Sequence, residues 1–233
     1  QITNTIAEIL SDDVFVPADY PQPHQLKILH ELQLQLKIKP HQESEEDVEL
    51  FKNIWEAAGG DKDKFSLNDP AWPNMLGFQS PTPISDVRGG GRLSCLALLH
   101  ITRSPRGRKL LQVTQRRRDR VVSKVLIPGD DDFDSYPFAP ALINVVRMLA
   151  ERFCLVGPHG LPHRTPLENT PSSNYRILQN SMEDFFDVVV DVMFMVEQQF
   201  VKVNGGYMAF PEVMKRVEEG MDSLLRQKAA LTL

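Results

Sequence analysis

SMEDFFDVVVDVMFMVEQQF, residues 181–200, is apolar enough to raise the question of a membrane span. Acidic residues interrupt its apolar run at Asp184, Asp187, Asp191 and Glu197. No run of eighteen uncharged residues therefore exists here, and the sequence argues against a helix that crosses a bilayer. The three valines at 188–190 would also suit a buried strand, but the length of the segment favours a helix. We expect a central helix that is hydrophobic over much of its circumference.

Helical patterns lie on both sides of this segment. Residues 24–39 alternate like a strand and also carry a helical stripe, and their Leu, Gln, Lys and Glu content favours a helix. Residues 44–60 begin with a capping-box pattern from Ser44 to Asp47 and stop at two glycines. Further helices are expected at 93–101, at 138–155 and from near Pro211 to about 225. The sequence predicts an all-α, single compact domain of roughly seven to nine helices.

The composition limits the class of protein. The chain has 233 residues, of which 42% are hydrophobic and 24% charged, as in one globular domain. Its net charge of -5 offers no overall electrostatic footprint for nucleic acid. Cys95 and Cys154 lie in apolar helical patterns, and we expect reduced core residues of a cytoplasmic protein. The chain starts at Gln1 and shows no secretory signal, so we expect the natural N-terminus, with any targeting signal, to be missing.

Two stretches imitate metal sites. Cys154, His159 and His163 have a metal-like spacing but lie near Pro and Gly residues without a fourth ligand, so we expect loop histidines at the surface. GDDDFD, residues 129–134, lacks the alternating oxygen ligands and the terminal Glu of a calcium loop. A phosphate-cradling GxxxxGK[ST] motif is also missing from the sequence. We expect neither a metal nor a cofactor in this domain.

A basic segment runs from Arg103 to Lys124. It holds nine basic residues and one acidic residue, Asp119, for a local charge of about +8. Such a segment could contact anionic lipid or the acidic side of a partner. We favour an exposed, partly disordered insertion, because an acidic run follows and no aromatic residue interleaves to stack on bases.

SDVRGGGRLSCLALLH, residues 85–100, places Arg88 directly ahead of three glycines. Consecutive glycines lower helix propensity and suit a sharp turn or a close approach of the backbone. Either the chain turns tightly here or something docks there.

The longer stretch WPNMLGFQSPTPISDVRGGGRLSCLALL, residues 72–99, resembles the signature of the ELMO (engulfment and cell motility) domain family. The matching positions are Trp72, Gly77, Phe78, Gln79, Pro83, Asp86, Arg88, Gly89 and Gly91. The sequence departs from that signature at Thr82, Ser85 and Val87, where the family usually has Asp, Thr and Phe. One extra residue also separates Trp72 from Gly77.

Two further stretches extend the resemblance. SYPFAPALINVVRML, residues 135–149, is similar to the YPFAxxxIN helix of the family, and GGYMAFPEVMKRVEE, residues 205–219, is similar to its YMDFxxVL segment. We expect an N-terminal helical extension at 1–44, an ELMO domain at 45–225 with a basic insertion at 103–136, and a C-terminal tail at 226–233. The resemblance implies an all-helical fold, in agreement with the periodicity.

The family resemblance also implies a function. Stand-alone ELMO-domain proteins act as GTPase-activating proteins for Arf-like small GTPases, and larger members are scaffolds that support DOCK-type exchange factors acting on Rac. The stand-alone group carries an arginine at the position of Arg88, so the resemblance implies an arginine finger that acts in trans on a partner GTPase. The alternatives are a non-catalytic scaffold for an exchange factor and a module recruited peripherally to membranes through Arg103–Lys124.

The neighbours of Arg88 are expected to support it. Trp72, Leu76 and Phe78, with Gly77 between them, are expected to be structural anchors of the motif. Asp86 and Gln79 could orient Arg88 or cap the following helix, and we favour capping. Gly89, Gly90 and Gly91 would let the backbone approach a partner closely. The competing hypothesis for Arg88 is an internal ion pair with Asp86 or with a helix carboxylate.

Overall fold

The computed structural model describes residues 21–123, 136–156, 174–203 and 209–232. These residues form nine α-helices and no strand, which confirms the all-α prediction. The helices are α2 (Pro23–Lys37), α3 (Glu45–Ala57), α4 (Ala71–Leu76), α5 (Pro83–Asp86), α6 (Gly91–Arg103), α7 (Pro105–Ser123), α8 (Phe138–Arg152), α9 (Glu183–Val203) and α10 (Phe210–Leu231). Three 3-10 turns, η1 (Lys62–Lys64), η2 (Val87–Gly89) and η4 (Tyr175–Ile177), join them.

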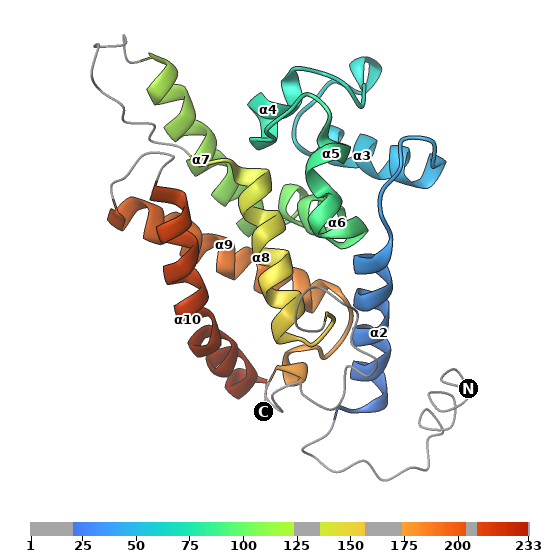
Figure 1. Cartoon of the computed structure of the whole chain (residues 1–233), viewed down its shortest axis with the longest axis vertical. Coiled ribbons are helices and arrows are strands. Elements are labelled where there is room, and N and C mark those ends of the chain that lie inside the picture. The colour runs from blue at the N-terminus through green and yellow to red at the C-terminus, as the bar shows by residue number, and fades with distance from the viewer. Residues whose placement is uncertain (1–20, 124–135, 157–173, 204–208, 233) are drawn as a thin grey trace.

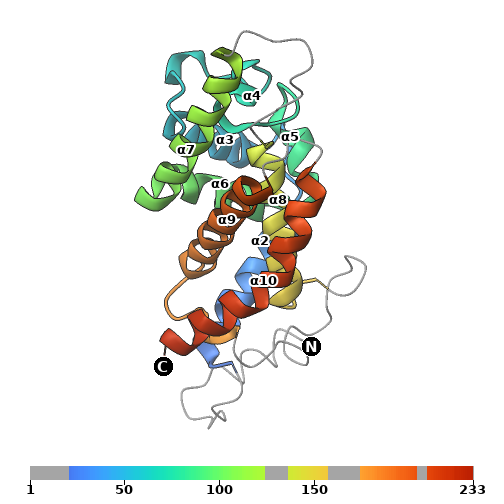
Figure 2. The ribbon, with the colours of Figure 1, turned by 90° about the vertical axis from the view of Figure 1, so that its left-hand side faces the viewer.

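Helix α6 is the hub of the packing. It contacts α2, α3, α7, α8 and α9, while α10 packs along α9. The short elements α4 and α5 gather with α3 at one end of the molecule, and α2 extends from there toward the opposite end (Figures 1 and 2). One hydrophobic cluster runs through α2, α3, α6, α8, α9 and α10 without a break. The described helices therefore share a single core.

Helix α9 supplies much of this core. Phe185, Val188, Val192 and Val196 are fully shielded from solvent, as a helix that is apolar over most of its circumference requires. The three valines at 188–190 are helical, so the helix interpretation of this segment is confirmed. Among the described residues, no helix is long and apolar enough to cross a membrane.

The expected ends of several helices are confirmed. Ser44 is the N-cap of α3, where its hydroxyl accepts a hydrogen bond from the Asp47 amide at 3.3 Å. Residues 24–37 lie within α2, so the helical interpretation of that ambiguous stretch is correct. Pro211 occupies the first turn of α10, which is a favoured place for proline. The helix expected at 138–155 ends earlier, at Arg152, because the chain turns at Cys154, whose φ is 54°.

The prediction of a disordered loop at Arg103–Lys124 is wrong for residues 105–123, which form α7. Leu110, Leu111 and Thr114 are buried along one face of this helix, and α7 packs against α6 and α9. Arg108, Lys109 and Arg116 are exposed, so these three basic residues lie on the solvated side of an amphipathic helix. The two metal-like stretches, His159 with His163 and residues 129–134, lie outside the described residues.

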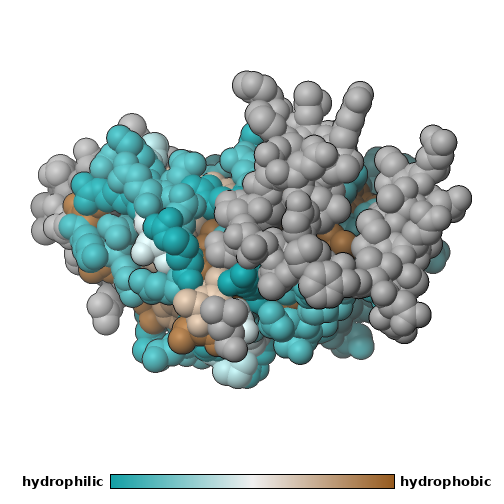
Figure 3. Space-filling model, turned by 90° about the horizontal axis from the view of Figure 1, so that it is seen from below, coloured by the Kyte–Doolittle hydropathy of each residue, from teal (hydrophilic) through white to brown (hydrophobic). Residues whose placement is uncertain are grey.

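The domain boundaries expected from the sequence also differ from those that the packing of the helices indicates. Helix α10 continues to Leu231 and buries Ala229, so residues 226–231 are part of the last helix rather than a separate tail. Helix α2, expected as an extension, buries Ile28, Leu29 and Leu32 in the common core. Seen from the end where α2 begins, the described surface is mostly hydrophilic, with apolar residues in small patches (Figure 3).

Candidate functional site

An aromatic cluster holds the start of the motif. The Trp72 side chain is fully buried, and its ring lies 5.0 Å from Trp55, 5.7 Å from Phe78 and 6.1 Å from Phe51, between ring centroids. The indole N–H of Trp72 donates to the carbonyl of Ser66 at 2.9 Å, so its polar atom is satisfied. Trp72, Leu76 and Phe78 are all buried, which confirms that they are core anchors.

A closed loop follows this cluster. Helix α4 ends at Leu76 and is capped by Gly77, whose left-handed conformation (φ 69°) suits glycine. The Gly77 amide donates to the Pro73 carbonyl at 2.9 Å. The Asp86 carboxylate then accepts hydrogen bonds from the Gln79 amide at 2.8 Å and from the Ser85 hydroxyl at 3.1 Å. The expected capping of the next helix by Asp86 or Gln79 is wrong, because the N-cap of α6 is Gly90 and no side chain caps the helix. Asp86 instead closes the loop that begins at Gln79.

Arg88 lies in the 3-10 turn η2, immediately before α6. Its neighbour Val87 is fully buried and fixes the turn to the core, while Arg88 itself is exposed. Within the described part of the chain, Arg88 forms no hydrogen bond and no ion pair with another residue. The carboxylate of Asp86 is engaged by Gln79 and Ser85 instead. The internal ion pair considered as the competing role of Arg88 is therefore not present in this structure.

The three glycines after Arg88 have different environments. Gly91 has a φ of 57°, and a Cβ atom placed there would lie 2.2 Å from the carbonyl oxygen of Leu36. The adjacent Arg92 amide donates to the carbonyl of Ile38 at 2.8 Å, so the chain after α2 touches the start of α6. A Cβ atom at Gly89 would meet nothing closer than Ile143, at 3.9 Å. Gly91 is required by contacts within the chain, and Gly89 is the exposed glycine of the three.

Arg92 is the buried arginine of this region. Its guanidinium binds the buried Asp47 carboxylate through two contacts of 2.8 Å and the exposed Glu46 carboxylate through a third of 2.8 Å. Burial acts to lower the pKa of Arg92, but the bonds to Glu46 and Asp47 outweigh burial and raise it. The sequence interpretation missed this residue. The available signals were an arginine on the buried side of an apolar helix and an aspartate in the first turn of α3.

Arg88 and Gly89 line a pocket of about 300 Å³. Three more cationic side chains border it: Lys37 at the end of α2, Lys39 just beyond, and Arg147 on α8. Its remaining walls are formed by Leu36, Ala150, Leu155 and Val156. Sequence reasoning missed this pocket, because its residues come from segments that only the fold brings together.

The described residues hold no group of three or more His, Cys, Asp or Glu side chains that could bind a metal ion. Cys95 and Cys154 are both buried and free, which confirms that they are core residues. Burial, with a smaller contribution from the Asp47 carboxylate, raises the pKa of the Cys95 thiol. This thiol is therefore a packing group rather than a reactive one.

The motif, the all-helical fold and the exposed Arg88 together define an ELMO-type domain. The chain belongs to the ELMO/CED-12 family, whose model matches residues 30–214. It is similar to the ELMO domain-containing protein C of Dictyostelium discoideum, with 25% identity over 181 residues that make up 76% of this chain and 26% of that protein. The chain thus spans about a quarter of the length of this relative. No solved structure matches the chain.

Proposed function

We propose that the protein is a GTPase-activating protein for an Arf- or Arl-type small GTPase, with Arg88 as its arginine finger. The observation that carries the proposal is the environment of Arg88, which is exposed and makes no hydrogen bond or ion pair within the described structure. An arginine that stabilises the fold normally has a partner, as Arg92 does with Asp47. A guanidinium left available is free to bind a group on another molecule.

The chemistry of GTP hydrolysis gives such an arginine a role. Negative charge is spread over the oxygens of the transferred phosphoryl group in the transition state, and a guanidinium inserted in trans offsets it. The planar fork of arginine donates two parallel hydrogen bonds, which the ammonium group of lysine cannot reproduce. The nucleotide and its magnesium ion would be held by the GTPase, and this chain would contribute Arg88 and a docking surface.

The elements around Arg88 suit it for this role because they hold its backbone in place. Val87 anchors the turn in the core, and the Asp86 carboxylate ties the preceding loop to the Gln79 amide. Arg92 fixes the following residues to Asp47 and to the carbonyl of Ile38. A fixed base lowers the entropy lost when Arg88 engages its target, and such positioning contributes to catalysis.

The proposal predicts that Arg88→Lys separates activity from stability. We expect the melting temperature to stay within about 2 °C, because an exposed and unpaired side chain contributes little to stability. Stimulated GTP hydrolysis should fall by roughly three orders of magnitude or more, since a finger acting in trans supplies that much of the rate. Both quantities are measured on the same preparation, with phosphate release from a panel of Arf, Arl and Rac GTPases.

Arg92→Lys is the matched control, since it makes the same change four positions away. Lysine cannot bridge Asp47 and Glu46 as arginine does, so the melting temperature should fall by roughly 5 °C or more. Stimulated hydrolysis by the fraction that remains folded should fall far less than in Arg88→Lys, because Arg88 itself is retained. An Arg88→Lys variant that is stable and fully active would end the finger proposal and favour a non-catalytic scaffold for a DOCK-type exchange factor.

A further inference from the structure

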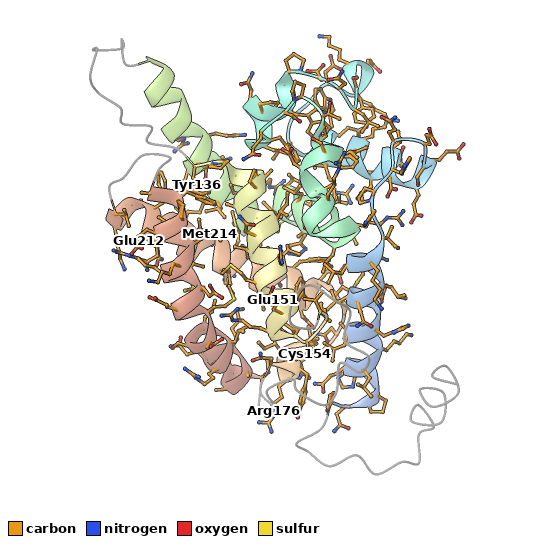
Figure 4. The ribbon with its side chains drawn as sticks, in the orientation of Figure 1. Tyr136, Glu151, Cys154, Arg176, Glu212 and Met214 are labelled. Carbon is orange, nitrogen blue, oxygen red and sulfur yellow. The ribbon has the colours of Figure 1, made fainter. Side chains whose placement is uncertain are left out.

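The pocket beside Arg88 has an unbalanced charge. Lys37, Lys39, Arg88 and Arg147 line it, and no carboxylate does. Arg147 has an ion-pair partner in Glu151, one turn along α8, but the Nε to Oε1 distance is 3.6 Å and both side chains are about half exposed. Figure 4 labels Glu151 on α8. Exposed pairs of this kind contribute little and are screened by salt. The pocket therefore presents nearly uncompensated positive charge to solvent.

Its walls add a second property. Ala150 and Leu155 are fully buried residues, and Leu36 and Val156 are partly buried beside them. A cationic rim over an apolar floor is complementary to a group with an apolar stem and an anionic head, such as a glutamate or aspartate side chain on a loop. The pocket volume of about 300 Å³ is at the low end of the range for small-molecule sites.

The net charge of the whole chain strengthens the preference of this pocket for an anionic group. The net charge of the protein is -5, so the chain as a whole repels an acidic partner. A concave, positively charged region on such a surface guides an acidic partner to one orientation and raises its association rate. That orientation would also bring the partner against Arg88, because Arg88 lines the same pocket.

We propose that this pocket, lined by Lys37, Lys39 and Arg147 beside Arg88, receives an acidic side chain that the partner GTPase carries next to its nucleotide site. The proposal rests on the function proposed above and assigns different roles to Arg88 and to the other cations of the pocket. Arg88 acts on the reacting phosphate, and the three other cations set the affinity and the orientation of the complex.

A double charge reversal tests this division. Lys39→Glu with Arg147→Glu should raise the GTPase concentration for half-maximal stimulation by roughly tenfold or more, because both changes place like charges opposite the partner. The maximal rate at saturation should stay within about twofold of the parent, because Arg88 is retained. Circular dichroism and a melting curve show whether the variant is folded.

The matched control is Lys27→Glu with Arg108→Glu. Both residues are exposed, on α2 and α7, and the net charge changes by the same amount. Lys27 lies roughly 15 Å along α2 from Lys37, at 1.5 Å per residue, so it is outside the pocket. This variant should keep the half-saturating concentration within about twofold of the parent, as surface charges distant from the contact do.

The outcomes separate the two proposals. If the pocket variant and its control have the same half-saturating concentration while Arg88→Lys still lowers the maximal rate, the pocket proposal is overturned and the function stands. If the unaltered protein stimulates no GTPase of the panel, the proposed function fails, and direct binding of GTPases loaded with a non-hydrolysable GTP analogue then decides about the pocket. A raised Kd for the pocket variant alone supports it, and equal Kd values or no binding overturn it.

One more arm distinguishes a lipid headgroup. Vesicles of phosphatidylcholine with and without a phosphoinositide are mixed with the parent, the pocket variant and the control. In one outcome, only the pocket variant fails to float with the phosphoinositide vesicles, and its half-saturating GTPase concentration is unchanged. This result would assign the pocket to a phosphorylated headgroup and overturn the proposal of an acidic side chain on the partner. Equal flotation of all three proteins, with a raised half-saturating concentration for the pocket variant, supports it.

Discussion

Arg88 and Arg92 lie four positions apart and have opposite environments. The side chain of Arg92 points into the junction of α3 and α6, where the buried Asp47 carboxylate needs a cation. An unpaired buried carboxylate would be costly, so this arginine is fixed by the fold. Arg88 lies one helical turn earlier in the chain, on a 3-10 turn that ends before α6, and its side chain remains in solvent. The same residue type therefore supports the fold at one position and is available to a partner at the other.

Cys95 gives the molecule a predictable response to alkaline pH. Its pKa is raised in the folded protein by burial and by Asp47, so the folded state keeps the thiol proton at a pH where the unfolded chain loses it. The contribution of Cys95 to stability is fully present below the ordinary thiol pKa of 9.0 and is lost as the pH rises above that value. The free energy of unfolding should fall by up to about 1.4 kcal/mol per pH unit from this residue.

Urea unfolding between pH 8 and pH 10 measures this slope, with Cys95→Ala as the comparison. The substitution removes the titrating group, so the decline of stability with pH should be shallower in the variant, whatever its stability at pH 8. Tyrosine and lysine residues titrate in both proteins and cancel in the difference. Equal slopes for the parent and the variant would show that Cys95 titrates alike in the folded and unfolded states.

At the scale of elements, the junction between α2 and α6 depends on Gly91. An alanine there would place its Cβ atom 2.2 Å from the Leu36 carbonyl oxygen at a φ of 57°, which combines a clash with backbone strain. We expect Gly91→Ala to lower the free energy of unfolding by at least about 2 kcal/mol. Gly89→Ala, whose Cβ atom would make only an ordinary contact with Ile143 at 3.9 Å, should change it by no more than about 0.5 kcal/mol.

Chemical denaturation of both glycine variants checks this contrast. Gly89→Ala also reports on the exposed surface, since any loss of stimulated hydrolysis in that stable variant would come from contact with the partner rather than from folding. Two variants of equal stability would mean that α2 does not press on the start of α6 in solution.

The sequence predicted those elements whose side-chain period is strong. Helix α9 is recognisable from its length and apolar content, and α3 from its cap at Ser44 and its closing glycines. Helix α7 was mistaken for a loop because the number of its charges obscured the buried positions Leu110, Leu111 and Thr114. The helical spacing of those three residues is present in the sequence, but the high local positive charge pointed to an exposed loop.

Some features of the candidate site could likewise be predicted from the sequence, and others could not. Trp72 and Phe78 were correctly expected in the core, because aromatic residues in a short motif commonly anchor it. The hydrogen bond from Gln79 to Asp86 was not expected, because capping and loop closure use the same residue types. The pocket could not be predicted, since Lys39 and Arg147 come to line one pocket only in the folded chain. The role of Arg88 in catalysis stays a prediction.

At the scale of the whole molecule, the continuous core predicts that α2 is indispensable. A chain that starts at Ser44 lacks Ile28, Leu29 and Leu32, which are buried in the core shared by the described helices. Each such side chain contributes about 1.5–3 kcal/mol, so roughly 5–9 kcal/mol is lost. That amount is comparable with the whole stability of an ordinary domain, about 5–15 kcal/mol.

Thermal melting followed by circular dichroism checks this expectation. The shortened chain should show no cooperative transition or one at a much lower temperature, and it should elute as an expanded or aggregated species. The control is a chain that starts at Pro21 and keeps α2 whole, which should melt like the parent. A stable domain starting at Ser44 would restore the boundary expected from the sequence.

The contact between the end of α2 and Gly91 places α2 where its movement would be transmitted to the start of α6. Its fifteen residues span roughly 22 Å, and the backbone just beyond them is bonded to the Arg92 amide, four positions after Arg88. A molecule that gripped the far end of α2 and tilted it would displace the Leu36 and Ile38 carbonyls. The Gly91 backbone lies directly against the Leu36 carbonyl, so this displacement would act on the start of α6, next to the turn that carries Arg88. A load on the far end of α2 would therefore act on the backbone at the start of α6, a few residues from Arg88.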